Sequence, residues 1–158
     1  MAEIAGRIAA VGRVGIVVSR YHERITTRLL EGAKRCCREA GLAEDQIDVV
    51  WVPGAFELGS VATAMAETGR YVALVALGCV VRGDTPHFDY VAGESARALG
   101  RVASDRGLPV GFGLLTVDVL QQAVDRAGGS AGNKGYEAAE AALRTADAIR
   151  QLRDGAAS

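Results

Sequence analysis

Apolar and polar positions divide the chain into alternating strand-like and helix-like segments. The strand-like segments are short apolar runs, predicted at residues 13–19, 47–52, 71–77 and 109–117. The first run, from Arg13 to Ser19, is rich in β-branched residues and lacks polar alternation. This pattern is typical of a strand that is buried on both faces of a parallel sheet.

Helix-like segments follow each of these strands. They are predicted at residues 25–40, 55–68, 88–106, 118–127 and 134–152, and a glycine-rich break at 128–132 separates the last two. In the first of them, apolar residues recur at helical spacing from Ile25 to Ala40, and Gly41 closes the segment. Because strands and helices alternate four times, the sequence predicts a single α/β domain over residues 1–158, with right-handed crossovers around a parallel sheet.

Charge and hydropathy narrow the classes of partner. The chain of 158 residues has a net charge of −1 and contains no long run of like charges. This composition argues against a nucleic-acid surface or a polybasic membrane patch, so the expected partners are small molecules or other protein chains. The first residues lack the pattern of a signal peptide, and no apolar run is long enough to span a membrane, so a cytoplasmic protein is expected.

Cysteine and histidine usage argues against disulfide and metal chemistry. Cys36 and Cys37 fall on the apolar stripe of the first helix, so we interpret them as packing residues. The odd total of three cysteines fits a reducing compartment. Two histidines without a Cys-x-x-Cys motif leave too few ligands for a metal site, and none is expected.

Three loops are predicted to form the binding site. They span residues 19–22, 53–57 and 78–87, and each follows a predicted strand. In open parallel sheets, ligands bind at the carboxyl ends of the strands. We therefore expect the three loops to converge on one pocket.

The stretch from Gly78 to Tyr90 is predicted to contain a strand end, a glycine-bounded turn and a helix start. Pro86 suits the first helical position and Thr85 suits the N-cap, so free backbone amides would point outward and attract an anion. The positive end of the helix would also keep His87 neutral and able to accept a proton. Asp84 stands where a phosphate-binding P-loop requires lysine, which argues against nucleoside triphosphate hydrolysis.

Four candidate residues have both a structural and a functional interpretation, and both remain open from these patterns alone. His87 is either a capping residue or a proton-transfer group. Glu57 either interacts with a helix dipole or accepts hydrogen bonds from substrate hydroxyls. Tyr21 is either a packing residue or a ring that stacks on a planar ligand. Phe112 lies within a predicted strand, where core packing is the default unless that end of the strand meets another subunit.

Two cations flank the glycine-rich break. Arg126 and Lys134 are either solvated or part of a phosphate site, for which Arg126 offers a bidentate fork. Cys79 is interpreted as a small hydrophobe whose backbone matters more than its sulfur. His22 and Asp84 are interpreted as loop residues, of which Asp84 is the better functional candidate.

Four segments, taken in order, resemble the lumazine synthase family over nearly the whole chain. They are Gly15–Tyr21, Trp51–Glu57, Gly78–Val91, and the pair Asp125–Gly128 and Gly132–Gly135. Together with the four predicted strands, the resemblance implies a three-layer, flavodoxin-like α/β sandwich with a four-stranded parallel sheet. It also implies a reaction of riboflavin synthesis that needs no metal or organic cofactor. In that reaction 5-amino-6-(D-ribitylamino)uracil condenses with 3,4-dihydroxy-2-butanone 4-phosphate to give 6,7-dimethyl-8-ribityllumazine, phosphate and water.

The resemblance also implies roles for the residues around the pyrimidine substrate. His87 matches the proton-transfer histidine of the family, and Tyr21 matches an aromatic residue that stacks on the pyrimidine. The segment that binds the ribityl chain is matched by Ala55, Phe56 and Glu57. The backbone that reads the pyrimidine edge is matched by Cys79, Val80 and Val81.

A second set of residues is implied for the phosphate and the subunit interface. Asp84 and Thr85 match the phosphate-side loop, and Arg126 matches the phosphate-binding arginine, with Lys134 in the same neighbourhood. An adjacent subunit supplies Phe112 and Arg126 in the family, so the resemblance implies an intersubunit pocket and a homopentamer as the smallest active unit. A decamer, a sixty-subunit icosahedral shell and an association with riboflavin synthase stay open.

The chain departs from the commoner family pattern at two binding positions. Tyr21-His22 stands where Phe-Asn is frequent, and Cys79 replaces a frequent threonine, so that only its backbone contact carries over. The rival interpretations are a non-catalytic cage protein that binds a flavin or lumazine, and a flavodoxin-like electron carrier that would be yellow as purified. His87 together with Arg126 favours the enzyme, because ligand storage needs neither proton transfer nor a phosphate trap.

Overall fold

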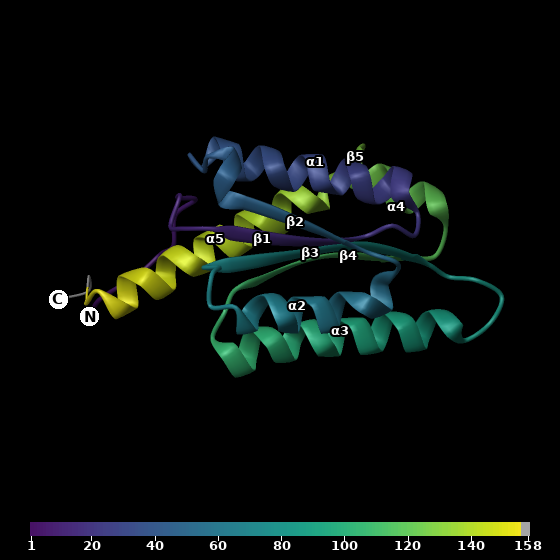
Figure 1. Ribbon diagram of the computed structural model, residues 1–158. Coiled ribbons are helices and arrows are strands. Elements are labelled where there is room, and N and C mark those ends of the chain that lie inside the picture. Colours follow the sequence, from purple (N-terminus) through teal and green to yellow (C-terminus); the bar gives the residue numbers. More distant parts are fainter. Residues whose placement is uncertain (156–158) are drawn as a thin grey trace.

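Four parallel strands in the order β2-β1-β3-β4 form the centre of the protein, in a computed structural model that describes residues 1–155. They are β1 (Val14–Ser19), β2 (Ile47–Val52), β3 (Ala73–Val81) and β4 (Val110–Val117). One face of the sheet is covered by α1 (Glu23–Glu39), α4 (Leu120–Arg126) and α5 (Lys134–Arg153) (Figure 1). The other face is covered by α2 (Leu58–Glu67) and α3 (His87–Arg106). The predicted three-layer, flavodoxin-like α/β sandwich with a four-stranded parallel sheet is therefore confirmed.

Short elements complete the chain. They are two 3-10 turns, η1 (Glu44–Gln46) and η2 (Ala55–Glu57), and an antiparallel hairpin of β5 (Ala127–Gly129) and β6 (Gly132–Asn133). The hairpin occupies the segment that was predicted only as a glycine-rich break. Two of its glycines, Gly128 at φ 98° and Gly132 at φ 80°, adopt left-handed backbone that other residues rarely take. None of the helices within residues 1–155 is long and apolar enough to cross a membrane.

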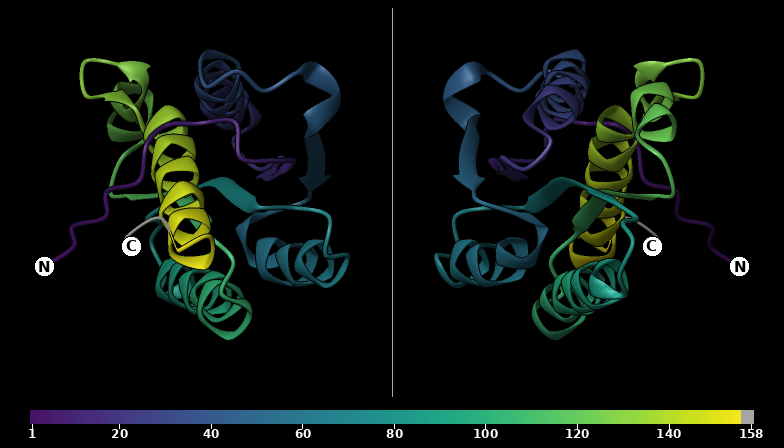
Figure 2. Two further views of the ribbon diagram at one scale, coloured as in Figure 1. Left: turned by 90° about the vertical axis from the view of Figure 1, so that its left-hand side faces the viewer. Right: turned by 90° about the vertical axis from the view of Figure 1, so that its right-hand side faces the viewer.

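Each face of the sheet has its own core. In β1, Val14, Ile16 and Val18 pack with residues of α1 and α5, whereas Val17 packs with residues of α2 and α3. All six residues of β1 are buried, as the unbroken apolar run predicted. The end-on views in Figure 2 show the two helical layers on opposite sides of the strands.

Strand β3 is longer than the sequence indicated. The predicted strand ended at Leu77 and a turn was expected at Gly78, but pairing with β4 continues to Val81. A Cβ atom on Gly78 would lie 2.9 Å from Leu114 Cδ1 and 3.1 Å from Ser19 Oγ. This glycine therefore provides space inside the sheet and does not mark a turn.

The N-cap of helix α3 lies one residue later than expected. Pro86 is the N-cap and His87 is the first helical residue, whereas Thr85 was expected to be the cap. The Thr85 hydroxyl still accepts a hydrogen bond from the His87 amide, at a long 3.4 Å. The helix ends at Gly107, whose φ of 59° is the left-handed conformation that commonly closes a helix.

Glycines allow α5 to lie against the main chain of its neighbours. A Cβ atom on Gly135 would lie 2.0 Å from the Leu29 carbonyl oxygen of α1. In β4, a Cβ atom on Gly111 would lie 2.2 Å from the Ala138 carbonyl oxygen of α5. Any larger residue at either glycine would push the helix away, since main-chain atoms have no rotamer by which to yield.

The start of α5 is also fixed by its cap. Asn133 accepts hydrogen bonds from the amides of Gly135 at 2.9 Å and Tyr136 at 3.0 Å. Its own amide group donates to the Arg28 carbonyl of α1 at 3.0 Å. One side chain therefore caps α5 and ties it to α1.

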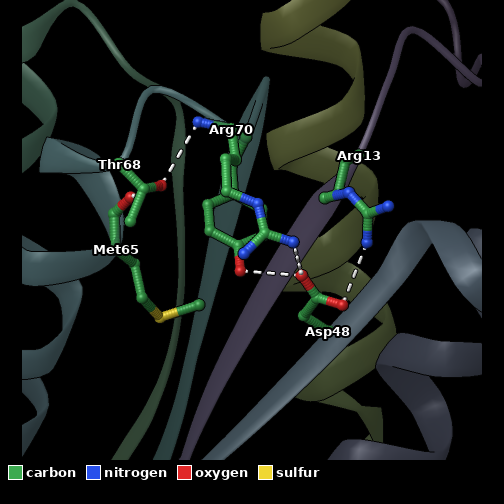
Figure 3. A network of polar contacts seen from close by, with 6 residues as sticks. Arg13, Asp48, Met65, Thr68 and Arg70 are labelled. Atoms are coloured by element: carbon green, nitrogen blue, oxygen red, sulfur yellow. Dashed lines mark hydrogen bonds and ion pairs between the residues drawn. The ribbon is translucent and has the colours of Figure 1, made fainter.

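A polar network joins three strands at the end of the sheet where they begin (Figure 3). Asp48 of β2 accepts hydrogen bonds from the Tyr71 hydroxyl at 2.8 Å and from the Arg13 guanidinium at 3.0 Å, and it pairs with Arg70 at 3.5 Å. The hydrogen bond from Tyr71, followed by the two arginines, holds the pKa of Asp48 below its ordinary value. The network fixes the spacing of β1, β2 and β3 at this end.

We expect the substitution Gly135→Ala to lower the free energy of unfolding by roughly 3 kcal/mol, because the added methyl overlaps the Leu29 carbonyl. Denaturant unfolding measures this effect. Gly100→Ala is the matched control, since nothing lies within 4 Å of a Cβ atom there and alanine is the better helix former. The control should raise the free energy of unfolding by about 0.5–1 kcal/mol. Equal effects at both positions would contradict the close contact between α1 and α5.

Candidate active site

The three predicted loops meet in one cavity at the carboxyl end of the sheet. The cavity has a volume of about 680 Å³ and lies between η2 and the first turns of α3. Its lining residues are Tyr21, Gly54, Ala55, Phe56, Glu57, Cys79, Val80, Val81, Gly83, Thr85, His87, Phe88, Tyr90 and Val91. The structure thus brings together all predicted site residues except Asp84, Phe112, Arg126 and Lys134.

The first wall of the cavity is the segment that follows β1. Main-chain hydrogen bonds that continue past the ends of β1 and β2 hold it in place. The Arg20 amide donates to the Val52 carbonyl at 2.8 Å, and the Tyr21 amide donates to the Pro53 carbonyl at 3.0 Å. His22 then turns the chain at φ 58°, the only positive φ at a non-glycine residue within residues 1–155. The Tyr21 side chain is 68% exposed, so it is not a packing residue. Its ring is available to a planar ligand.

The second wall, η2, offers hydrogen-bonding groups of both kinds. The Glu57 amide donates a hydrogen bond to the Gly54 carbonyl at 3.2 Å. The amides of Ala55 and Phe56 have no acceptor among residues 1–155, so they can donate to a ligand. The half-buried Glu57 side chain lines the same cavity and can accept from hydroxyl groups.

The floor of the cavity is the last part of β3, where side chains alternate between the two faces. Cys79 and Val81 pack into the core beneath α1 and α5, whereas Val80 packs into the core beneath α2 and α3, on the cavity side. Cys79 and Val81 therefore present their backbone to the cavity. The Cys79 sulfur points to the other face, in agreement with its interpretation as a small hydrophobe.

His87 lies at the rim of the cavity, at the end of the connection from β3 to α3. Arg82, to which the sequence analysis gave no role, holds this connection in place. Arg82 donates to Asp118 at 2.9 Å, pairs with Asp89 at 3.5 Å and lies 4.5 Å from the centre of the Phe88 ring. The loop is thus fastened both to the end of β4 and to the first turn of α3. Local sequence patterns could not predict the ion pair between Arg82 and Asp118, because the two residues are 36 positions apart.

Two aromatic residues beside His87 were also missed. Phe88 and Tyr90 line the cavity, and Tyr90 is 69% exposed. The available signal was their position in the first helical turn, where every exposed side chain lies close to the loop. Together with Tyr21 and Phe56, they place four aromatic side chains around the cavity.

Four predicted site residues lie outside this cavity. Asp84 is exposed on the loop between β3 and α3 but does not line the cavity. Phe112 and Lys134 line a second groove of about 570 Å³ beside β4, and Phe112 is 52% exposed, so the core-packing interpretation of this residue is wrong. Arg126 belongs to α4 on the opposite face of the sheet, where its guanidinium donates to the Gln122 carbonyl at 3.0 Å (Figure 1).

An α/β sandwich with an aromatic pocket, a carboxylate and a histidine at the carboxyl ends of its strands has the architecture of an enzyme that acts on a small planar molecule. Within residues 1–155, no group of three or more His, Cys, Asp or Glu side chains is placed to hold a metal ion. A model of the 6,7-dimethyl-8-ribityllumazine synthase family matches residues 12–150. The chain belongs to this family, which makes it a transferase-type enzyme of riboflavin biosynthesis.

The buried thiols lead to a prediction about pH. Burial raises the pKa of Cys36 from 9.0 to about 12, and it raises the pKa values of Cys37 and Cys79 to about 11. Above pH 9 the unfolded chain loses these protons while the folded chain keeps them, so deprotonation favours the unfolded state. We expect the contribution of these thiols to the free energy of unfolding to be present below pH 9 and to fall as the pH rises from 9 to 11. Denaturant unfolding at a series of pH values measures this fall.

The matched control is Cys37→Ala, which removes one of the three thiols and should make the fall with pH shallower. Thiol labelling at pH 8 gives an independent check, because neutral buried thiols do not react. We expect no labelling of the native protein and three labelled cysteines in denaturant. Fast labelling of the native protein would show that at least one thiol is accessible.

Proposed function

We propose that the protein condenses 5-amino-6-(D-ribitylamino)uracil with 3,4-dihydroxy-2-butanone 4-phosphate to form 6,7-dimethyl-8-ribityllumazine, without a metal or organic cofactor. The observation that carries the proposal is the convergence of Tyr21, Glu57 and His87 on one cavity, from three separate connections of the sheet. The family match over residues 12–150 supports the same reaction class.

The chemistry is a sequence of proton transfers around two held reactants. The pyrimidine amine attacks the ketone, and an imine forms with loss of one water. Phosphate then leaves, and ring closure releases a second water. Such a reaction needs a positioned amine and ketone, a proton shuttle and a cationic site for the leaving phosphate.

In this proposal the pyrimidine lies between the first wall and the floor of the cavity. The exposed Tyr21 ring stacks on it, and the backbone at Cys79–Val81 reads its edge. The ribityl hydroxyls bind along η2, where the amides of Ala55 and Phe56 donate and the Glu57 carboxylate accepts.

His87 transfers protons in this proposal. It lines the cavity as the first residue of α3, so it lies beside both the floor and the β3–α3 loop. Thr85, on that loop, also lines the cavity and can donate its hydroxyl to the phosphate. Asp84 lies on the same loop, outside the lining that one chain provides.

The phosphate site is completed by a second copy of the chain. Within one chain, Arg126 lies across the sheet from the cavity, and Phe112 and Lys134 lie beside the edge strand β4. A head-to-tail contact, in which one copy offers this edge to the cavity of the next, closes into a ring when the rotation allows it. We propose that the ring is a homopentamer, with Arg126 and Phe112 entering each cavity from the neighbour.

An assay with the two substrates tests the proposed reaction directly. Purified protein should accelerate the appearance of the lumazine chromophore and of inorganic phosphate above the uncatalysed rate. His87→Ala should reduce turnover by about tenfold to a hundredfold. This loss is small for a general acid–base residue, because positioning of the substrates carries most of the rate. Substrate binding should change little. A variant with equal losses in turnover and affinity would indicate that His87 binds and does not shuttle protons.

Mixing two variants of low activity tests the intersubunit site. We expect His87→Ala and Arg126→Ala to be weakly active alone, and randomly mixed pentamers of the two to regain about one quarter of the wild-type sites. Co-expression followed by measurement of phosphate release checks this. If both residues of a site come from one subunit, no combination restores activity. Phe112→Ala in place of Arg126→Ala provides a second pairing with the same expected recovery.

A further inference from the structure

Ser95 joins α3 to η2, the second wall of the cavity. Its side chain is 1% exposed, and its hydroxyl donates to the Ala55 carbonyl of η2 at 3.0 Å. A serine inside a helix commonly bonds to a carbonyl one turn earlier in its own helix. This one reaches a different element, 40 positions earlier in the chain.

The position of Ser95 on α3 relates it to the rim of the cavity. His87, Val91 and Ser95 follow one another at intervals of four residues, so they lie along one face of the helix. His87 and Val91 line the cavity, and the buried Ser95 lies one turn further on. The same face of α3 therefore carries His87 at the rim of the cavity and Ser95, which is hydrogen-bonded to η2.

The hydrogen bond from Ser95 also orients a neighbouring amide. A trans peptide holds the Ala55 C=O and the Phe56 N–H antiparallel in one plane, and residues 1–155 contain no cis peptide. The Ala55 carbonyl accepts from Ser95 and from the Leu58 amide, so two donors on the interior side fix that plane. The Phe56 N–H then points away from the interior, and no group within residues 1–155 accepts its hydrogen bond.

We propose that Ser95 is a positioning residue that holds η2 so that the Phe56 amide can bind a hydroxyl of the polyol chain. The ligand assignment rests on the proposed function, whereas the anchoring of η2 does not. Ser95 does not touch the substrate in this proposal. It acts by fixing the direction of a donor that would otherwise rotate with its peptide plane.

Hydrogen exchange in the ligand-free protein tests the anchoring. Ser95→Ala should raise the exchange rate of the hydrogen-bonded amides of Glu57 and Leu58 by roughly fivefold, the factor that corresponds to loss of one neutral hydrogen bond. Thr63→Ala is the matched control, because its hydroxyl donates to the Gly59 carbonyl at 2.8 Å within α2 and bridges no elements. Unchanged exchange in Ser95→Ala would overturn the proposal.

Binding of two pyrimidines tests the ligand assignment. The affinity for 5-amino-6-(D-ribitylamino)uracil should fall about fivefold in Ser95→Ala, while that for 5,6-diaminouracil, which lacks the polyol, should stay at the wild-type value. Equal losses for both ligands would show a general structural role and would overturn the polyol assignment. If the wild-type protein binds neither pyrimidine, the proposed function fails, and the exchange experiment still decides the anchoring.

Ser95→Cys separates the hydrogen bond from the volume of the side chain. The thiol fills the space but is a weak donor, so this variant should behave like Ser95→Ala in both experiments. Wild-type behaviour in Ser95→Cys would show that packing alone holds η2, which would overturn the proposal. This variant also serves if the alanine substitution prevents folding.

Discussion

Main-chain contact between α5 and its two neighbours is the constraint on which much of the structure depends. Gly135 brings the helix against α1, and Gly111 brings β4 against the helix. Because these contacts involve backbone atoms, they leave little freedom in the placement of α5. Phe112, the neighbour of Gly111 in β4, lies on the opposite face of that strand.

The cavity, by contrast, depends on a few ties between connections at one end of the sheet. The bond from the Tyr21 amide to Pro53 joins the first two connections. Arg82 fastens the third connection to the end of β4, and Ser95 joins α3 to η2. These groups lie outside the strands, yet each extends the order of the sheet or of a helix into a loop.

The sequence was sufficient for features that local pattern determines. The bounds of Ile47–Val52 were predicted as observed, and the three convergent loops follow from the rule for parallel sheets. Gly78 was misread because a glycine within a strand and one in a turn look alike in sequence. Ser95 and its bond to Ala55 could not be predicted, since nothing local links residues that far apart. The exposure of Phe112 was equally hidden, because an apolar run does not reveal which strand forms an edge.

The alternation Gly111-Phe112-Gly113 limits how the chain can change in length. Both glycines face α5, where a Cβ atom at Gly113 would lie 3.3 Å from Ala138 Cβ, and the phenylalanine faces the other way. One residue inserted or deleted between α3 and β4 would shift the strand by one position and direct the aromatic ring into α5. This connection should therefore keep its length among related chains, whereas the η1 turn, which has no buried residue, can accept insertions.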